Sequence, residues 1–266
     1  MQPKVRVLIL TGSRTGLASL ALPRLAEEQG IDVAMVVLSQ GAVPNPWRER
    51  RRKLRKVLKI GPFGAINGMR MRRWFTDEIA RRLRIPAIEA VAQSLEVHLE
   101  RTPATNSPRT VELFRKASAD LGLSLGNSYI SPRVFTIPDQ GMINVHHEIL
   151  PEFRGAQSVI WQIHEGLRET GYTIHQIDRD IDTGSILLQR RMPIEWMPTL
   201  AETVSHNYAR LYTASAEGLV SVVKDYAAIA AGAKPQGRGR TYTTPTLTQY
   251  LKMLRQHRRL SQKAKS

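Results

Sequence analysis

The sequence predicts an α/β protein built on an open, mostly parallel sheet with helices on both faces. A short aliphatic run at Val5–Leu10 is followed by a glycine-containing turn, a helical pattern over 17–26 and a second buried run at Ile31–Leu38. A strand, a turn, a helix and a strand in this order indicate a parallel βαβ unit. The composition agrees, because 42% hydrophobic and 23% charged residues over 266 positions exclude disordered, collagen-like and coiled-coil classes.

Positive charge is concentrated in two segments. The chain has 39 Lys and Arg against 23 Asp and Glu, for a net charge of +16. From Trp47 to Phe75 there are eleven basic residues and one acidic residue, and from Leu251 to Ser266 there are six basic residues and none acidic. The rest of the chain is neutral. Each of the two basic segments is able to meet phosphates, an anionic membrane surface or only water. The region of about 41–75 is interrupted by Pro and Gly and is therefore expected to be an insertion.

Residues 47–59 indicate a helix with two possible environments. Trp47, Leu54, Val57 and Leu58 fall near one stripe, and Arg and Lys occupy the other positions. Such a helix is able to make a peripheral contact with an anionic membrane. The sequence favours the simpler arrangement, in which Trp47 and the leucines pack on the body of the protein and the cations face solvent.

The remaining elements follow from apolar runs and Pro or Gly punctuation. Pro86 predicts a helix end after Ile79–Leu83, and Pro108 predicts a helix start that leads to Ala119. Thr199–Ala231 indicates a long helix. A further helix is expected at Gln157–Gly166, and strands are expected at Leu95–Leu99, Leu121–Leu125, Met142–His146, Tyr172–Ile177 and Ser185–Met192. Together these elements predict a Rossmann-like main domain at 1–197, with a C-terminal helix and basic tail at 198–266.

Three absences narrow the class of protein. With no Cys, the chain has no disulfide framework, no thiolate zinc site and no cysteine nucleophile. No apolar run approaches the about 20 residues that span a bilayer. The apolar core of the N-terminal segment is too short for a signal peptide. A cytoplasmic protein is therefore expected.

The residues that carry chemistry lie between Met142 and Leu188. Asn144 and His146 are two apart at the end of an expected strand, so their side chains share one face, and ligands of open α/β sheets generally bind at the carboxyl ends of strands. Asp182, in a turn between two later strands, is expected to reach the same edge. An amide, an imidazole and a carboxylate suit acyl transfer to an amine, because they stabilise an oxyanion, move a proton and hold the imidazole charged.

An aspartic protease is a weaker interpretation of the Asp182-Thr-Gly184 turn. Those enzymes need two carboxylates that share a proton. This chain has no second Asp-Thr-Gly and shows a helix-rich α/β pattern.

Taken together, the motifs resemble the formyltransferases that use 10-formyltetrahydrofolate. They are Asn144-Val-His146, Leu150-Pro-Glu-Phe-Arg-Gly155 and Asp182-Thr-Gly184, with the aspartate 38 residues after the asparagine. The family includes glycinamide ribonucleotide, methionyl-tRNA and amino-sugar formyltransferases. The likeness is most specific over 120–195 and covers 1–119 in strand order only. It implies that 10-formyltetrahydrofolate is the formyl donor, that Asn144, His146 and Asp182 are catalytic, and that no metal is needed.

The resemblance also implies a folate site. The pterin is expected among main-chain groups of two loops, 126–130 and 178–182, with a histidine on the strand that leads into the second loop. The expected folate-binding residues are Gly126, Asn127, Ser128, Tyr129, Ile130, His175 and Asp178. One position departs from many relatives, which have Ser where this chain has Glu148. Glu148 is expected to form a salt bridge or to alter the acceptor pocket.

The favoured acceptor is the amine of a nucleotide-linked amino sugar. Methionyl-tRNA formyltransferases carry an extra C-terminal β-barrel domain, and only about 70 residues follow position 197 here. Basic residues at 48–59 favour the tRNA alternative, because the tRNA enzymes of the family also insert a basic loop in their first half. The Thr11–Gly16 turn either binds an acceptor phosphate at a helix N-terminus or is a plain strand-to-helix turn.

A third interpretation is an RNA-binding protein without catalytic activity. A catalytically inactive relative would bind RNA through 48–73 and the basic tail, with a strong dependence on salt. Aromatic residues are few there, and no RNA-recognition motif is present.

Overall fold

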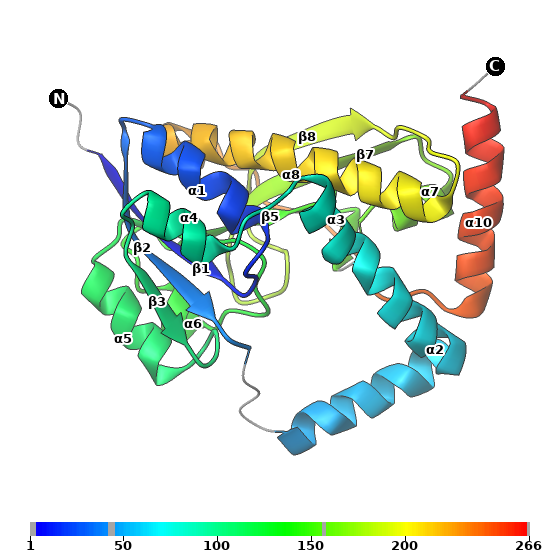
Figure 1. Cartoon of the computed structure of the whole chain (residues 1–266), viewed down its shortest axis with the longest axis horizontal. Coiled ribbons are helices and arrows are strands. Elements are labelled where there is room, and N and C mark those ends of the chain that lie inside the picture. Colours follow the sequence, from blue (N-terminus) through cyan, green and yellow to red (C-terminus); the bar gives the residue numbers. More distant parts are fainter. Residues whose placement is uncertain (1–3, 42–45, 156–157, 265–266) are drawn as a thin grey trace.

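The computed structural model describes residues 4–41, 46–155 and 158–264 of the chain. At its centre is a seven-stranded sheet in the order β3-β2-β1-β4-β5-β7-β8 (Figure 1). The first five of these are parallel, whereas β7 is antiparallel to both of its neighbours. The strands are β1 (Val5–Thr11), β2 (Ile31–Ser39), β3 (Leu99–Thr102), β4 (Leu121–Ser124), β5 (Met142–His146), β7 (Glu169–Gln176) and β8 (Ile186–Pro193). The predicted open, mostly parallel sheet is confirmed.

Helices cover both faces of this sheet because the side chains of β1 alternate between them. Val7 and Ile9 join the core under α1 and α8, and Leu8 and Leu10 join the core under α5 and α6. The helices are α1 (Leu17–Glu27), α2 (Pro46–Phe75), α3 (Asp77–Arg82), α4 (Ile88–Ser94), α5 (Pro108–Ala117), α6 (Pro132–Phe135), α7 (Ile160–Glu165), α8 (Leu200–Lys224), α9 (Tyr226–Ala231) and α10 (Leu247–Gln262).

Local sequence explains where the longer helices begin. The Ser107 side chain accepts a hydrogen bond from the Thr110 backbone N–H, and Pro108 occupies the first turn of α5. Thr199 and Glu202 form a reciprocal capping box at the start of α8. The predicted starts of these two helices are thus confirmed.

Other element boundaries differ from the sequence prediction. Leu95 caps the end of α4, and the backbone N–H of Val97 bonds to Ala92 O, so β3 begins only at Leu99. The apolar residues at 95–97 pack on the core from a turn, which a search for apolar runs does not distinguish from a strand. The expected helix over 199–231 divides at Asp225 into α8 and α9. The helix expected from Gln157 begins at Ile160, and Gln157 itself lies outside the described residues.

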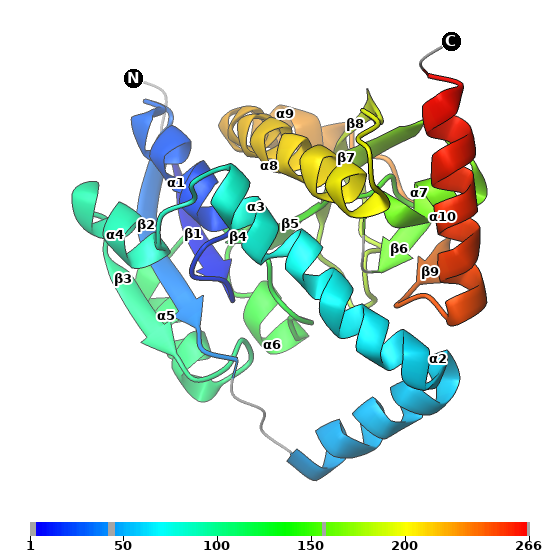
Figure 2. The ribbon, with the colours of Figure 1, turned by 45° about the vertical axis from the view of Figure 1, so that its right-hand side comes forward.

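The basic insertion is one long helix with a break. Gly61 has non-helical dihedrals (φ 74°, ψ 167°) and is followed by Pro62, so α2 consists of two halves that meet at an angle (Figure 2). The second half is held by the C-terminal part of the chain. A Cβ at Gly68 would lie 2.6 Å from Thr244 Cγ2, and Arg70 Nη2 donates a hydrogen bond to the Tyr250 hydroxyl at 2.6 Å.

The first half of α2 does not pack as the sequence favoured. Trp47, Leu54 and Leu58 are 75%, 60% and 76% exposed, respectively. The expectation that Trp47 and the leucines lie against the body is therefore wrong. Of the side chains described in this half, only Ile60 is buried.

The C-terminal segment contributes more than a long helix and a basic tail. Residues after α9 form strand β9 (Arg240–Tyr242), which pairs in parallel with β6 (Phe153–Gly155), and then α10. Tyr250, Met253, His257 and Leu260 form the buried side of α10, which packs against α7, α2 and α8. In the described part of the chain, no helix is both long enough and apolar enough to cross a bilayer.

Candidate active site

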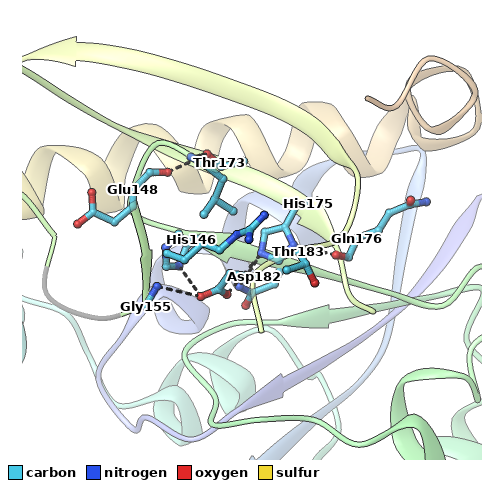
Figure 3. Close-up of polar contacts among 12 residues, drawn as sticks. His146, Glu148, Gly155, Thr173, His175, Gln176, Asp182 and Thr183 are labelled. Carbon is cyan, nitrogen blue, oxygen red and sulfur yellow. Dashed lines mark hydrogen bonds and ion pairs between the residues drawn. The ribbon is translucent and has the colours of Figure 1, made fainter. Parts of the chain in front are cut away.

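The structure brings Asn144, His146 and Asp182 together on one face of β5. Asn144 and His146 point to the same side because they are two residues apart, and they pair across the sheet with His175 and Thr173 of β7. The turn between β7 and β8 places Asp182 over this face (Figure 3). Asp182 Oδ2 lies 3.8 Å from His146 Nδ1, and Asp182 Oδ1 lies 3.8 Å from His175 Nε2. The predicted convergence of an amide, an imidazole and a carboxylate is present.

His175 fixes the orientation of the Asn144 amide. His175 Nδ1 lies 2.8 Å from the carbonyl oxygen of Gln176, which only accepts, so Nδ1 carries the proton. Burial lowers the pKa of His175 to about 4, against the opposing effect of Asp182, so the ring is neutral near pH 7. Nε2 is then an acceptor, and Asn144 Nδ2 donates to it at 3.2 Å. The other N–H of the Asn144 amide remains for a ligand.

His146 is held in a complementary way. Its Nε2 lies 3.1 Å from the carbonyl oxygen of Phe153, so Nε2 donates, and Nδ1 is the ring nitrogen that this hydrogen bond leaves available. That atom faces Asp182, with both side chains nearly buried. The ring nitrogen of His146 that is not bonded to Phe153 therefore lies on the side of the carboxylate.

The structure explains each residue type in the Asp182-Thr-Gly184 turn. Asp182 has φ 56°, in the left-handed region that Asp adopts more readily than most residues. The Thr183 hydroxyl donates to Asp178 Oδ1 at 2.6 Å and braces the loop. A Cβ at Gly184 would lie 1.8 Å from the carbonyl oxygen of Gln176, so only glycine allows this close approach.

A second loop, 147–155, which we call the catalytic loop, lies on the other side of the site. The backbone N–H of Gly155 donates to Asp182 Oδ2 at 3.3 Å. The Thr173 hydroxyl donates to Glu148 O at 2.7 Å and accepts from the Leu150 N–H at 3.2 Å, which ties the loop to β7. Gly155 has φ 99°, and a Cβ there would lie 2.3 Å from Tyr242 O. The Arg-Gly pair thus lets β6 lie against β9.

Sequence reasoning did not identify Thr173 or Tyr242 as supports of the site. The Tyr242 ring stacks on Phe153, with centroids 5.3 Å apart, and lies 4.7 Å from Trp161. Tyr242 therefore holds the residue whose carbonyl oxygen orients His146. The only signal in the sequence was an aromatic residue in a polar segment, which did not predict this contact.

Glu148 makes a hydrogen bond and no salt bridge in the described part of the chain. Its side chain is buried and accepts a hydrogen bond from Gln162 Nε2. Burial raises the pKa of Glu148 well above its ordinary value. Neighbouring His147 is also buried, its pKa is lowered to about 3 by burial, and its ring stacks on Tyr212. The salt bridge expected of Glu148 is thus replaced by a hydrogen bond to Gln162 within a buried cluster.

The loop 126–130 leaves the sheet between β1 and β4, where the strand order changes direction. Asn127 Nδ2 donates to Leu10 O at 2.6 Å, and Thr11 Oγ1 donates to Leu125 O at 2.8 Å, so this loop lies against the Thr11–Gly16 turn. Such a position is the usual ligand crevice of open α/β sheets. Gly126, Ser128 and Tyr129 are exposed, whereas Ile130 is buried in the core.

The second expected folate loop also has internal contacts. Asp178 Oδ1 accepts from Thr183 and from the Asp180 backbone N–H, so this carboxylate braces the turn. A cavity of about 440 Å³ lies beside the loop and is lined in part by Met142, Gln176 and Asp178, but the catalytic candidates do not line it. The folate contacts of both loops and of His175 stay predictions.

Comparison with known proteins identifies the family of the chain. Residues 74–223, more than half of the chain, match the formyl transferase family model. Over 115 residues the chain is 36% identical to a methionyl-tRNA formyltransferase of Syntrophus aciditrophicus (43% of this chain, 37% of that protein). Over 110 residues it is 36% identical to a GDP-perosamine N-formyltransferase of Brucella melitensis (41% of this chain, 42% of that protein). The matched region thus spans less than half the length of these curated relatives.

Solved structures show the same fold at low sequence identity. Glycinamide ribonucleotide transformylase 1 of Symbiobacterium toebii superposes with a TM-score of 0.61 at 15% identity, over 90% of this chain and 94% of that one. An N-formyltransferase of Helicobacter canadensis, in complex with folinic acid and dTDP-3-aminofucose, superposes with a TM-score of 0.54 at 16% identity, over 89% and 71%. With the family match and the converging side chains, we conclude that this chain belongs to the formyl transferase family.

Proposed function

We propose that this protein transfers a formyl group from 10-formyltetrahydrofolate to the primary amine of a nucleotide-linked amino sugar, with Asn144, His146 and Asp182 as the catalytic residues. The observation that carries the proposal is the convergence of these three side chains within a site braced by His175 and Gly155. Membership of the formyl transferase family supports the reaction class.

The hydrogen-bond donors and acceptors of these three residues indicate which step of the reaction each residue serves. The neutral acceptor amine attacks the formyl carbon, and the free N–H of Asn144 donates to the oxygen as it becomes negative. His146 exchanges a proton at Nδ1, and Asp182 orients the ring and accepts the proton of the amine. The new bond joins the formyl carbon to the acceptor nitrogen, the bond to the folate nitrogen breaks, and the folate nitrogen receives the proton.

The loop after β4 suits the folate donor. Asn127 Oδ1 is buried and has no hydrogen-bond partner among the described residues, and the neighbouring residues Gly126, Ser128 and Tyr129 are exposed. A pterin ring offers N–H donors and ring acceptors that match such groups.

Two observations support an amino sugar as the acceptor. The chain is 36% identical over 110 residues to a GDP-perosamine N-formyltransferase. The segment after α9 supports the catalytic loop, because its strand β9 pairs with β6 and its helix α10 packs against α7, α2 and α8. The second candidate is methionyl-tRNA, because a methionyl-tRNA formyltransferase is 36% identical to the chain over 115 residues and the exposed half of α2 is strongly cationic.

The release of tetrahydrofolate from 10-formyltetrahydrofolate distinguishes these candidates. The full chain is assayed with GDP- and dTDP-linked 3-amino and 4-amino sugars and, separately, with methionyl-tRNA. Turnover on an amino sugar that is lost in His146→Ala and kept in His98→Ala, an exposed histidine outside the site, is the expected result. Turnover on charged tRNA alone would replace the acceptor assignment. Failure to bind folate, together with salt-dependent RNA binding, would favour the inactive RNA-binding alternative.

A further inference from the structure

The first half of α2, residues 46–60, which we call the basic arm, carries an apolar stripe that the body of the protein does not cover. Trp47, Leu54 and Leu58 are spaced by seven and four residues, so they fall on one side of the helix, and all three are largely exposed. Figure 1 and Figure 2 both show the basic arm projecting from the body, away from the central sheet.

Cations flank this stripe on both sides. Helical spacing places Arg50 on one flank and Arg51 and Arg55 on the other, and the Arg50 guanidinium lies 5.5 Å from the centre of the Trp47 ring. Residues 50–59 contain seven basic side chains and no acidic one. The basic arm thus combines a narrow apolar stripe with a dense positive charge.

The break at Gly61 separates the basic arm from the part of α2 that has a role in the body. Beyond the break, Met71 is buried, Arg70 bonds to Tyr250, and Gly64 and Gly68 admit the 244–245 segment. Before the break, only Ile60 is buried among the described side chains. The exposed Trp and Leu residues are therefore not explained by packing within this chain.

We propose that the basic arm binds the surface of an anionic lipid bilayer. Lying in the plane of the interface, the helix inserts Trp47, Leu54 and Leu58 among the acyl chains, and the flanking Arg and Lys side chains extend to the lipid phosphates. A nucleic acid would meet the cations and leave the apolar stripe in water. An anionic membrane satisfies both features at once. The proposal does not depend on the acceptor of the formyl group.

Vesicle sedimentation of the full chain tests the role of the apolar stripe. The protein is mixed with vesicles of phosphatidylcholine alone or of phosphatidylcholine with phosphatidylglycerol, and we expect binding to the anionic vesicles. L54S/L58S is expected to bind about tenfold more weakly or worse, because the buried apolar area drives insertion. Leu251→Ser, which alters an exposed leucine on α10, is the matched control and is expected to bind like the unaltered protein. Thermal unfolding confirms that each variant is folded.

A charge-reversal pair tests whether binding is local to the basic arm. R51E/R55E, which reverses two charges flanking the apolar stripe, is expected to abolish binding. K252E/R255E on α10 makes the same change in net charge and is expected to keep most of the binding. Equal losses in the two pairs would show unspecific attraction by net charge and would overturn the proposal. Tighter binding to duplex RNA than to anionic vesicles at the same salt concentration, unaffected in L54S/L58S, would also overturn it and assign the basic arm to nucleic acid.

Discussion

The Asn144 amide has one N–H committed to His175 and one N–H left for the reacting oxygen. Asn144→Asp keeps the size of the side chain and removes both donors. We expect kcat for formyl transfer to fall by about 10²–10³-fold, which is typical for the loss of one oxyanion donor. Steady-state kinetics measure this change, and an Asn144→Asp enzyme within a factor of about three of the original kcat would remove Asn144 from its assigned role.

His175 acts through Asn144, as a positioning residue. His175→Ala leaves the Asn144 amide without its acceptor, so we expect a loss in kcat of about tenfold, smaller than the loss for Asn144→Asp, with little change in the KM of the acceptor. His175→Gln keeps an acceptor oxygen and is expected to restore part of kcat. Because burial lowers the pKa of His175 to about 4, titration of this ring does not shape the pH–rate profile between about pH 6 and pH 9.

Glu148 makes the stability of the protein depend on pH. Its pKa in the folded state lies well above 4.5, so above pH 4.5 the unfolded chain releases a proton that the folded chain retains, and stability falls as pH rises towards the folded-state pKa. Glu148→Gln removes this loss. The free energy of unfolding of the variant, relative to the original protein, is expected to increase by up to about 1.4 kcal/mol per pH unit over that window. Urea unfolding at about pH 5 and about pH 8 measures it, and a pH-independent difference would contradict a raised pKa of Glu148 in the folded state.

Among the elements, the turn between β7 and β8 is the one on which the site depends most directly. Gly184→Ala would place a methyl group against the carbonyl oxygen of Gln176. We expect a loss of about 1–3 kcal/mol in the free energy of unfolding, together with a kcat close to that of Asp182→Ala, because the turn that carries Asp182 must shift. Gly30→Ala, whose Cβ would meet open space, is the control. If Gly184→Ala retained full activity, the turn would not be what positions Asp182.

The sequence was most informative about elements whose residues repeat at short range. Asn144 and His146 were placed on one face by the two-residue period of a strand, and the structure confirms that placement. For the basic arm, the helical period identified the apolar stripe, but no period reveals what faces a stripe, so the environment of Trp47 was predicted wrongly. Strand β9 has three residues and a partner far away in the chain, and such a pairing leaves no local pattern to detect.

The C-terminal basic segment shows a pattern that the prediction did not use. Tyr250, Met253, His257 and Leu260 recur at helical spacing and form the buried side of α10. The segment was predicted as a basic tail because of the cations between these residues, but the cations occupy only the exposed side of the helix. A search for spacing instead of for net charge would have predicted this helix.

At the scale of the whole molecule, the catalytic loop and the C-terminal segment stabilise each other. Tyr242→Ala removes the ring that stacks on Phe153 and lies beside Trp161. We expect the free energy of unfolding to fall by about 1–3 kcal/mol and kcat to fall with it, because Phe153 O orients His146. Tyr242→Phe keeps the ring and is expected to retain both properties. Calorimetry and the tetrahydrofolate assay measure them, and a destabilised but fully active Tyr242→Ala would separate the two roles.

Because β6 pairs with β9, the catalytic loop of a newly made chain gains its support only after β9 has been synthesised. During synthesis from the N-terminus, a ribosome that has reached residue 232 has produced Asn144, His146 and Asp182 but not the strand that holds Phe153–Gly155 in place. The sheet is then able to form while the catalytic loop is still unsupported. A protease that cuts the largely exposed 233–239 connector of the finished protein would leave the support of the loop to the noncovalent contacts of β9 and α10 alone, without touching a catalytic side chain.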